Sequence, residues 1–170
     1  MTDAGRPASP LRVSAQVHVA ADPHEVWRLM TDWSRQHEWI WATQVRGGQG
    51  LGATVVGWTG VGPVGFTDTM VVSEWDPPLR CVVQHKGRLV RGSGTFEVIP
   101  VGEEADFRWT EDLELPLPPA MGKMAALAIR PVAEASLAAS LRRFIDEVMP
   151  RFSGPVEAAR GVAASHATSD

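Results

Sequence analysis

The chain has 170 residues, a formal net charge of −4 and a single cysteine, Cys81. This length suits one domain with a substantial core, and a mildly acidic chain lacks the basic surface with which proteins bind nucleic acid, so we expect no nucleic-acid partner. One thiol excludes an intrachain disulfide and any metal site built on several cysteines. The absence of a disulfide leads us to expect a cytoplasmic protein. Residues 1–10 lack an apolar signal segment, and no apolar run reaches membrane-spanning length, so we expect no membrane span.

The N-terminal part of the chain predicts a loose tail, one strand and two short helices. Residues 1–10 are small and polar, as in a flexible tail, whereas apolar and polar residues alternate over 11–20, as in a half-buried strand. A helix begins after Asp22, because its carboxylate can cap free N–H groups and Pro23 fits the first turn. This helix should end near Asp32, and a second short helix should cover residues 34–39.

Six further strand patterns follow, separated by turns rich in glycine and proline. We place these strands at residues 42–47, 52–59, 64–75, 79–86, 88–99 and 105–115. The spacing is typical of antiparallel hairpins and leaves no room for βαβ units. The segment Gly60–Gly65 has the spacing of a dinucleotide-binding fingerprint, but a strand follows it and Pro63 lacks an N–H, so we interpret it as a hairpin turn.

The pattern changes to that of a helix over residues 119–149, where apolar residues recur at intervals of three and four. Pro131 should kink this helix or split it in two. Residues 151–170 are rich in small residues and predict a second flexible tail. The sequence therefore predicts one domain over residues 11–150 between two tails.

Several local motifs occur along the chain in a characteristic order. They are Asp22–Trp27 at a helix entry, Trp39, Glu74–Pro78 at a strand end, Gly92–Phe96 and Trp109–Leu113. Over residues 11–149 the chain resembles the START-like (SRPBCC) helix-grip superfamily, and within it the polyketide cyclase/dehydrase group. The resemblance implies an α+β fold in which a seven-stranded antiparallel sheet curves around a long C-terminal helix, with two short helices after the first strand and an internal apolar cavity. Members include lipid carriers, hormone receptors, cyclases and hydratases, so the fold does not choose the function.

Three ionisable residues alternate with apolar residues on their strands and are our candidate catalytic residues: Asp68, His85 and Glu111. Glu111 shares a strand face with Trp109, and burial there would raise its pKa and suit it to proton transfer. His85 can move protons near neutral pH. Each also has a structural interpretation, as a solvated or paired group at a strand end. A register slip of one residue would turn Glu111 to the other face of the sheet.

The candidate ligand-binding residues are those expected to line the cavity from the sheet and from the C-terminal helix. They are Trp39, Trp58, Phe66, Asp68, Met70, His85, Phe96, Trp109, Glu111, Met124, Leu127 and Leu141. No pair of histidines has the i, i+4 spacing of a zinc site, so we expect no metal, and no motif indicates a cofactor. Cys81, in the middle of a strand, is expected to be an inert small hydrophobic residue.

These observations leave three hypotheses open. The first is a module that binds a small hydrophobic molecule, such as a lipid or a polyketide-like compound, between the sheet and the C-terminal helix. The second is a cyclase or dehydratase that uses the cavity carboxylates as acid and base. The third is an interaction protein with a filled core. Gly57, Gly92 and Gly94 argue against it, because small residues within strands indicate open space or a bend in the sheet. The sequence does not decide whether the chain is an enzyme, or whether it forms a monomer or a homodimer.

Overall fold

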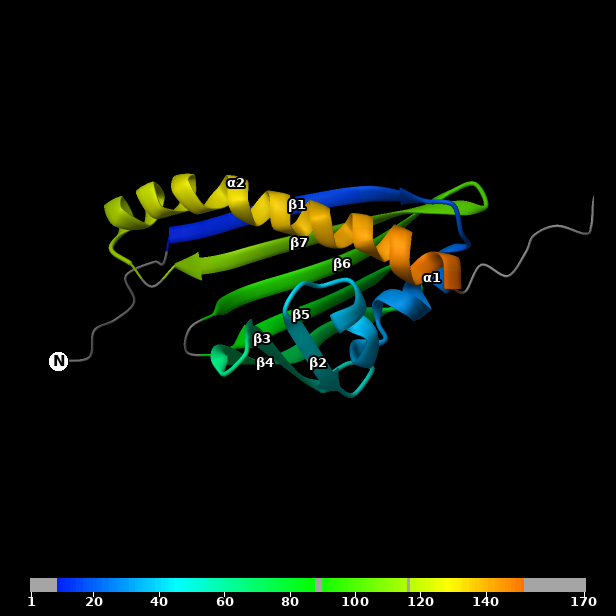
Figure 1. The fold of residues 1–170 in the computed structure, drawn as a ribbon, viewed down its shortest axis with the longest axis horizontal. Helices are drawn as coiled ribbons and strands as arrows, with labels where there is room; N and C mark the ends of the chain where they lie inside the picture. Colours follow the sequence, from blue (N-terminus) through cyan, green and yellow to red (C-terminus); the bar gives the residue numbers. More distant parts are fainter. Residues whose placement is uncertain (1–8, 88–89, 116, 152–170) are drawn as a thin grey trace, which may run out of the picture.

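A seven-stranded antiparallel sheet in the order β1-β7-β6-β5-β4-β3-β2 forms the body of the protein, and one long helix lies along β1 (Figure 1). The computed structural model describes residues 9–87, 90–115 and 117–151. The strands are β1 (Ser9–Val19), β2 (Thr43–Gly47), β3 (Thr54–Val61), β4 (Val64–Asp76), β5 (Arg80–Lys86), β6 (Arg91–Val101) and β7 (Glu104–Leu115). The predicted helix-grip fold is confirmed.

The alternation of side chains decides which face of the sheet is buried. On β7, Phe107 is fully buried and Trp109 nearly so, on the face that Leu11 and Val13 of β1 share. Glu111 lies opposite Val13 in the register of the two strands, so it belongs to the same inner face. Polar residues such as Arg108 alternate with these residues and lie on the outer face, which is the pattern of a sheet with one buried face.

Two short helices follow β1 and cover part of the inner face. The Asp22 carboxylate accepts a hydrogen bond from the His24 N–H at 2.8 Å, and α1 (Pro23–Met30) therefore begins where the sequence predicts. The second helix, η1 (Trp33–Glu38), is a 3₁₀ helix. Its tighter turns place Trp33 and Gln36 on the buried side, three residues apart.

The C-terminal helix α2 (Pro119–Arg143) continues through Pro131 as one element, so the chain is not split there. A π-helical turn, η2 (Phe144–Val148), and a 3₁₀ turn, η3 (Met149–Arg151), extend it. Leu141 and Phe144 are buried in the core, whereas most of the N-terminal half is exposed. In the part of the chain that the structure describes, Ala120–Val148 is the one helix long and apolar enough to cross a membrane, a criterion that core helices also meet.

Five aromatic rings form a cluster where η1, the sheet and η2 meet. Trp39, which ends η1, is fully buried and lies with its ring 5.3 to 5.9 Å from those of Phe96, Phe107, Trp109 and Phe144. Most of these contacts are edge-to-face, each contributing about 0.5–1.5 kcal/mol beyond the burial of area. Beside this cluster, a hydrogen bond of 3.1 Å from Arg143 Nη2 to the Glu38 carbonyl joins the end of α2 to η1.

The boundaries of the predicted strands differ from the observed ones by at most three residues, and the predicted helix over 119–149 comprises α2 with the turns that extend it. The first strand begins at Ser9 rather than 11, because β1 pairs with β7 as far as Ser9 opposite Leu115. The sixth strand begins at Arg91 rather than 88. The predicted tails, residues 1–10 and 151–170, lie outside the described residues except for Ser9, Pro10 and Arg151.

Gly92 generates a prediction about the sheet. Its φ is +119°, and a Cβ at this position would overlap the Asp112 carbonyl oxygen of β7. Because the β7 backbone would have to move, Gly92→Ala should lower the free energy of unfolding by at least about 3 kcal/mol. Gly102, with a φ of +65° and open space around it, is the matched control, and Gly102→Ala should cost only about 1–2 kcal/mol. Urea unfolding measures both, and equal losses would contradict the prediction.

Candidate functional site

A cavity of about 300 Å³ lies over the inner face of the sheet. Strands β3 to β7 form its floor, and Thr43 and Val45 of β2 also line it. The helix η1 and the segment leading to β2 cover part of it. The lining residues are Trp33, Gln36, Ile40, Thr43, Val45, Val55, Gly57, Thr59, Phe66, Asp68, Met70, Cys81, Val83, His85, Val90, Gly94, Phe96, Trp109, Glu111 and Leu113. None of the described lining residues comes from α2. The expected position between sheet and C-terminal helix therefore needs correction, because α2 lies along the edge strand β1.

Three ionisable side chains form a hydrogen-bonded cluster in this cavity. His85 Nδ1 lies 2.5 Å from Asp68 Oδ2, and His85 Nε2 lies 3.1 Å from Glu111 Oε2. The indole N–H of Trp109 donates to the other oxygen of Glu111 at 2.7 Å. The side chains of Asp68, His85 and Glu111 are only 11%, 8% and 14% exposed. We call these three residues the acid–base cluster.

The strand order explains how the cluster forms. Asp68 is on β4, His85 on β5 and Glu111 on β7, so His85 must reach across β6 to meet Glu111. Gly94 of β6 faces Glu111 in the register, and a Cβ there would lie 2.9 Å from Glu111 Oε1. Glycine at position 94 therefore leaves the space in which the Glu111 carboxylate lies.

The two carboxylates determine the charge of His85. Burial alone would lower the pKa of His85, but its hydrogen bonds with Asp68 and Glu111 and their negative charges outweigh burial and raise the pKa to about 9. His85 is therefore an imidazolium at neutral pH. With both ring nitrogens protonated it donates one hydrogen bond to each carboxylate.

Two buried polar atoms have no hydrogen-bond partner among the described residues. One is Asp68 Oδ1, and the other is the indole N–H of Trp39. Asp68 Oδ1 lies against Gly87, where a Cβ would come within 2.9 Å of it. An unpartnered carboxylate oxygen is costly in an apolar interior, so Asp68 is the member of the cluster that retains capacity to accept a hydrogen bond.

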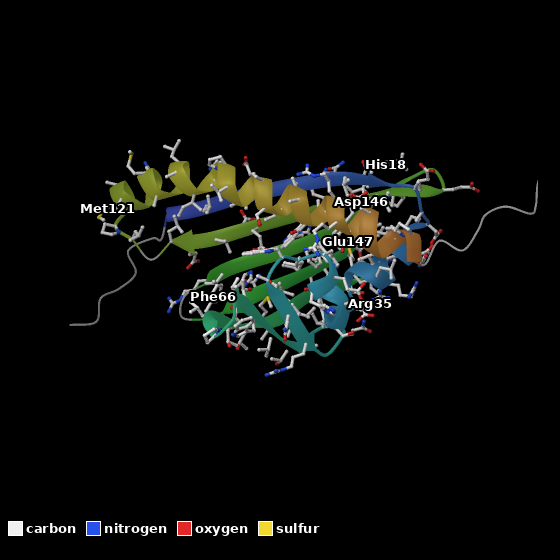
Figure 2. All side chains as sticks on the ribbon, viewed as in Figure 1. His18, Arg35, Phe66, Met121, Asp146 and Glu147 are labelled. Atoms are coloured by element: carbon white, nitrogen blue, oxygen red, sulfur yellow. The ribbon has the colours of Figure 1, made fainter. Side chains whose placement is uncertain are left out.

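The structure brings seven of the twelve candidate ligand-binding residues to the cavity: Phe66, Asp68, Met70, His85, Phe96, Trp109 and Glu111. Trp58 lies on the opposite face of the sheet, over Gly60 and Gly65. Trp39 and Leu141 are buried in the core behind the lining. Met124 and Leu127 are 70% and 72% exposed on the N-terminal half of α2. Figure 2 shows Met121 at this end of the helix and Phe66 beside the β3–β4 hairpin.

The cavity residues of β3 were not among the candidates, because Trp58 was expected to face the cavity and adjacent residues of a strand face opposite sides of the sheet. Val55, Gly57 and Thr59 line the cavity, so Trp58 between them is on the outer face. Gly57 pairs with Asp68 of β4, and residues paired across two strands lie on the same face of the sheet. Pairing β3 with β4 in this register would therefore have placed Gly57, not Trp58, on the cavity side. The residues that cover the cavity, such as Gln36 of the short helix η1 and Ile40 after it, give no periodic signal.

The remaining ionisable group in the described lining is Cys81. Burial, with a smaller contribution from the charge of Glu74, raises the pKa of its thiol to about 12, so the thiol is neutral and unreactive at physiological pH. Among residues 9–87, 90–115 and 117–151, no three His, Cys, Asp or Glu side chains are arranged to hold a metal ion. The cavity chemistry of the described residues therefore belongs to the acid–base cluster.

Comparisons with known proteins give one family and several similar folds. The model of the family "Polyketide cyclase / dehydrase and lipid transport" matches residues 10–148. No curated protein matches the chain. TTHA0849 of Thermus thermophilus has a similar structure, with a TM-score of 0.68 and 19% identity over 84% of this chain and 99% of that one. The Zhui aromatase/cyclase of Streptomyces sp. R1128 has a TM-score of 0.60 and 20% identity over 82% and 98%. The di-domain aromatase/cyclase StfQ of the steffimycin pathway has a TM-score of 0.65 and 14% identity, and the match covers 84% of this chain and 52% of that one.

His85 generates a prediction about stability and pH. Because its pKa is raised from 6.5 to about 9 on folding, its contribution to stability is fully present below pH 6.5 and is lost as the pH rises through 9. The difference in free energy of unfolding between the wild type and His85→Gln should therefore decrease as the pH rises. We expect a decrease on the order of 3 kcal/mol from below pH 6.5 to above pH 9. Urea unfolding of both proteins at several pH values measures the margin.

The comparison with His85→Gln is needed because His18 also has a raised pKa, through hydrogen bonds with Asp106 and Glu104. That group is present in both proteins and cancels in the difference. A margin that stays constant between pH 6 and pH 10 would contradict the charged state of His85.

Proposed function

The chain belongs to the polyketide cyclase / dehydrase and lipid transport family, and on that premise we propose that it binds a small hydrophobic molecule in the cavity over strands β3 to β7. The observation that carries this proposal is the cavity itself: apolar walls of Val55, Val83, Phe96 and Trp109 surround a few convergent polar groups. Ligand pockets commonly have this composition, with apolar walls for affinity and polar groups for orientation. A filled-core interaction protein would have large side chains in place of Gly57 and Gly94.

The size of the cavity limits the ligand. A volume of 300 Å³ equals that of about ten water molecules in the liquid and lies at the lower end of the range for ligand pockets. A fused-ring compound or a short acyl chain fits this space, whereas a two-chain lipid would have to extend beyond it. We therefore favour a compact, polyketide-like or aromatic ligand. The cytoplasmic location and the possible homodimer stay predictions.

A second candidate function is acid–base catalysis on such a ligand, which the acid–base cluster favours. Catalysis of this kind needs more than one titratable group close to one spot, and Asp68 and Glu111 both contact His85. Asp68 would take a proton from a carbon between two carbonyl groups, leaving an enolate. The enolate carbon would then attack another carbonyl carbon of the same ligand, whose C=O π bond breaks to leave an alkoxide that takes the proton back from Asp68. His85 would stay protonated and stabilise the negative charge that develops on the substrate.

The occupied hydrogen bonds of the cluster weigh in favour of binding. Both nitrogens of His85 carry protons, so it cannot act as a base. Each oxygen of Glu111 already accepts a hydrogen bond, which leaves Asp68 as the one carboxylate of the cluster with an unpartnered oxygen. Ligand binding is therefore our first proposal and catalysis the second.

Blocking the cavity tests the binding function. Val83 faces the cavity from β5, and its neighbour Gln84 faces the other side of the sheet beside Ser73. Val83→Phe should weaken binding of the neutral fluorescent probe N-phenyl-1-naphthylamine by about tenfold or more, because the added ring takes up space that the probe needs. Gln84→Phe should bind as the wild type does. Titration followed by probe fluorescence measures both.

The two variants introduce the same side chain at adjacent positions of β5, on opposite faces of the sheet. An effect of the extra ring that does not depend on the cavity should therefore appear in both. Equal weakening in both, or binding unchanged by Val83→Phe, would count against the cavity as the binding site. Native mass spectrometry of the purified protein, followed by organic extraction, would identify a ligand that copurifies.

Exchange of a carbon-bound proton tests the catalytic function. In deuterated buffer the wild type should accelerate exchange at the central carbon of benzoylacetone above the buffer rate, and Asp68→Asn should lose this acceleration because an amide is no base. Nuclear magnetic resonance follows the exchange directly. If benzoylacetone binds but exchanges at the buffer rate, the protein binds its ligand without this chemistry.

A further inference from the structure

The described lining of the cavity carries an uncompensated negative charge. Its ionisable groups are the carboxylates of Asp68 and Glu111, the imidazolium of His85 and the neutral thiol of Cys81. Two carboxylates and one cation leave a single negative charge among side chains that are otherwise uncharged and mostly apolar. A charge in such surroundings has lost most of its hydration and interacts strongly with any charged group that enters.

Asp68 is where this charge is least satisfied. Its Oδ2 accepts the hydrogen bond from His85, and its Oδ1 has no partner in the part of the chain that the structure describes. Glu111 differs, because one of its oxygens pairs with His85 and the other with the indole N–H of Trp109. The side chain of Asp68 also keeps an exposed edge toward the cavity.

We propose that the cavity selects compact apolar ligands that carry a hydrogen-bond donor, a protonated amine above a hydroxyl, and that it excludes carboxylates, with Asp68 as the group that recognises the donor. This inference rests on the proposed binding function and adds the chemical class of the ligand. An ammonium group neutralises the remaining charge and supplies the hydrogen bond that Asp68 lacks. A hydroxyl supplies the hydrogen bond alone. A carboxylate supplies neither and places a like charge beside two carboxylates.

Four probes with the same naphthalene body test this selectivity: naphthalene, 2-naphthol, 2-naphthylmethylammonium and 2-naphthoate. Isothermal titration calorimetry at neutral pH measures their dissociation constants for the wild type. We expect the ammonium to bind about ten- to a hundredfold more tightly than naphthalene, and the hydroxyl about tenfold more tightly, as is typical of hydrogen bonds to charged and neutral groups. Naphthoate should bind more weakly than naphthalene.

Two variants separate recognition by Asp68 from the charge of the cluster as a whole. Asp68→Asn and Glu111→Gln each neutralise one of the two carboxylates that contact His85. Only Asp68 has an unpartnered oxygen. Asp68→Asn should abolish the preference for the ammonium and relieve the exclusion of naphthoate. Glu111→Gln should keep most of the preference for donors. Thermal unfolding of each variant identifies a loss of fold, and the wild-type series tests the selectivity without any variant.

Each outcome bears on one proposal. If all four probes bind the wild type equally, or if naphthoate binds best, the selectivity is overturned while the binding function stands. If the preference for the ammonium survives in folded Asp68→Asn, recognition by Asp68 is overturned. If none of the probes binds and N-phenyl-1-naphthylamine also fails to bind, the binding function itself is overturned.

Discussion

The packing of one tryptophan, Trp39, joins η1, the sheet and the C-terminal end of the chain's helical segment. Trp39 ends a 3₁₀ helix that follows the first strand by only a short stretch of chain, yet its ring contacts Phe96 and Phe107 of the sheet and Phe144 beyond the long helix. These segments are far apart in sequence, and the Trp39 ring contacts all of them. With Trp39 in place, η1 is fixed over the sheet, and the space that remains beside it becomes the cavity.

The same cluster explains why the cavity concentrates its charge. Phe96 and Trp109 contact Trp39 on one side and the cavity on the other, so the wall is rigid and apolar. Apolar walls make an isolated carboxylate expensive, and His85 offsets this cost for two carboxylates at once. The Trp109 indole connects both layers, because its ring packs in the aromatic cluster while its N–H donates to Glu111.

Much of the fold followed from patterns that are local in the sequence. Alternation over residues 105–115 places Phe107, Trp109 and Glu111 on one face, and that face is buried because it is the more apolar one. Alternation could not choose the face of β3, since valine and glycine occur on both of its faces and Trp58 favoured the wrong one. Contact between His85 and Glu111 depends on the strand order and on the space at Gly94. The sequence next to His85 or next to Glu111 indicates neither of these. Met124 and Leu127 continue the apolar period of α2 past the end of its buried half, so periodicity alone assigned them to the cavity.

The long helix contributes to the core but not to the described lining of the cavity, and this division has a consequence for how the protein can change over evolutionary time. Residues such as Thr59, Phe66 and Met70 line the cavity from β3 and β4, outside the aromatic cluster that fixes η1. Substitutions there alter the shape offered to a ligand at little expense to the cluster. A lineage with this architecture can therefore exchange one ligand for another through drift in two neighbouring strands, while the long helix and the aromatic cluster are inherited unchanged.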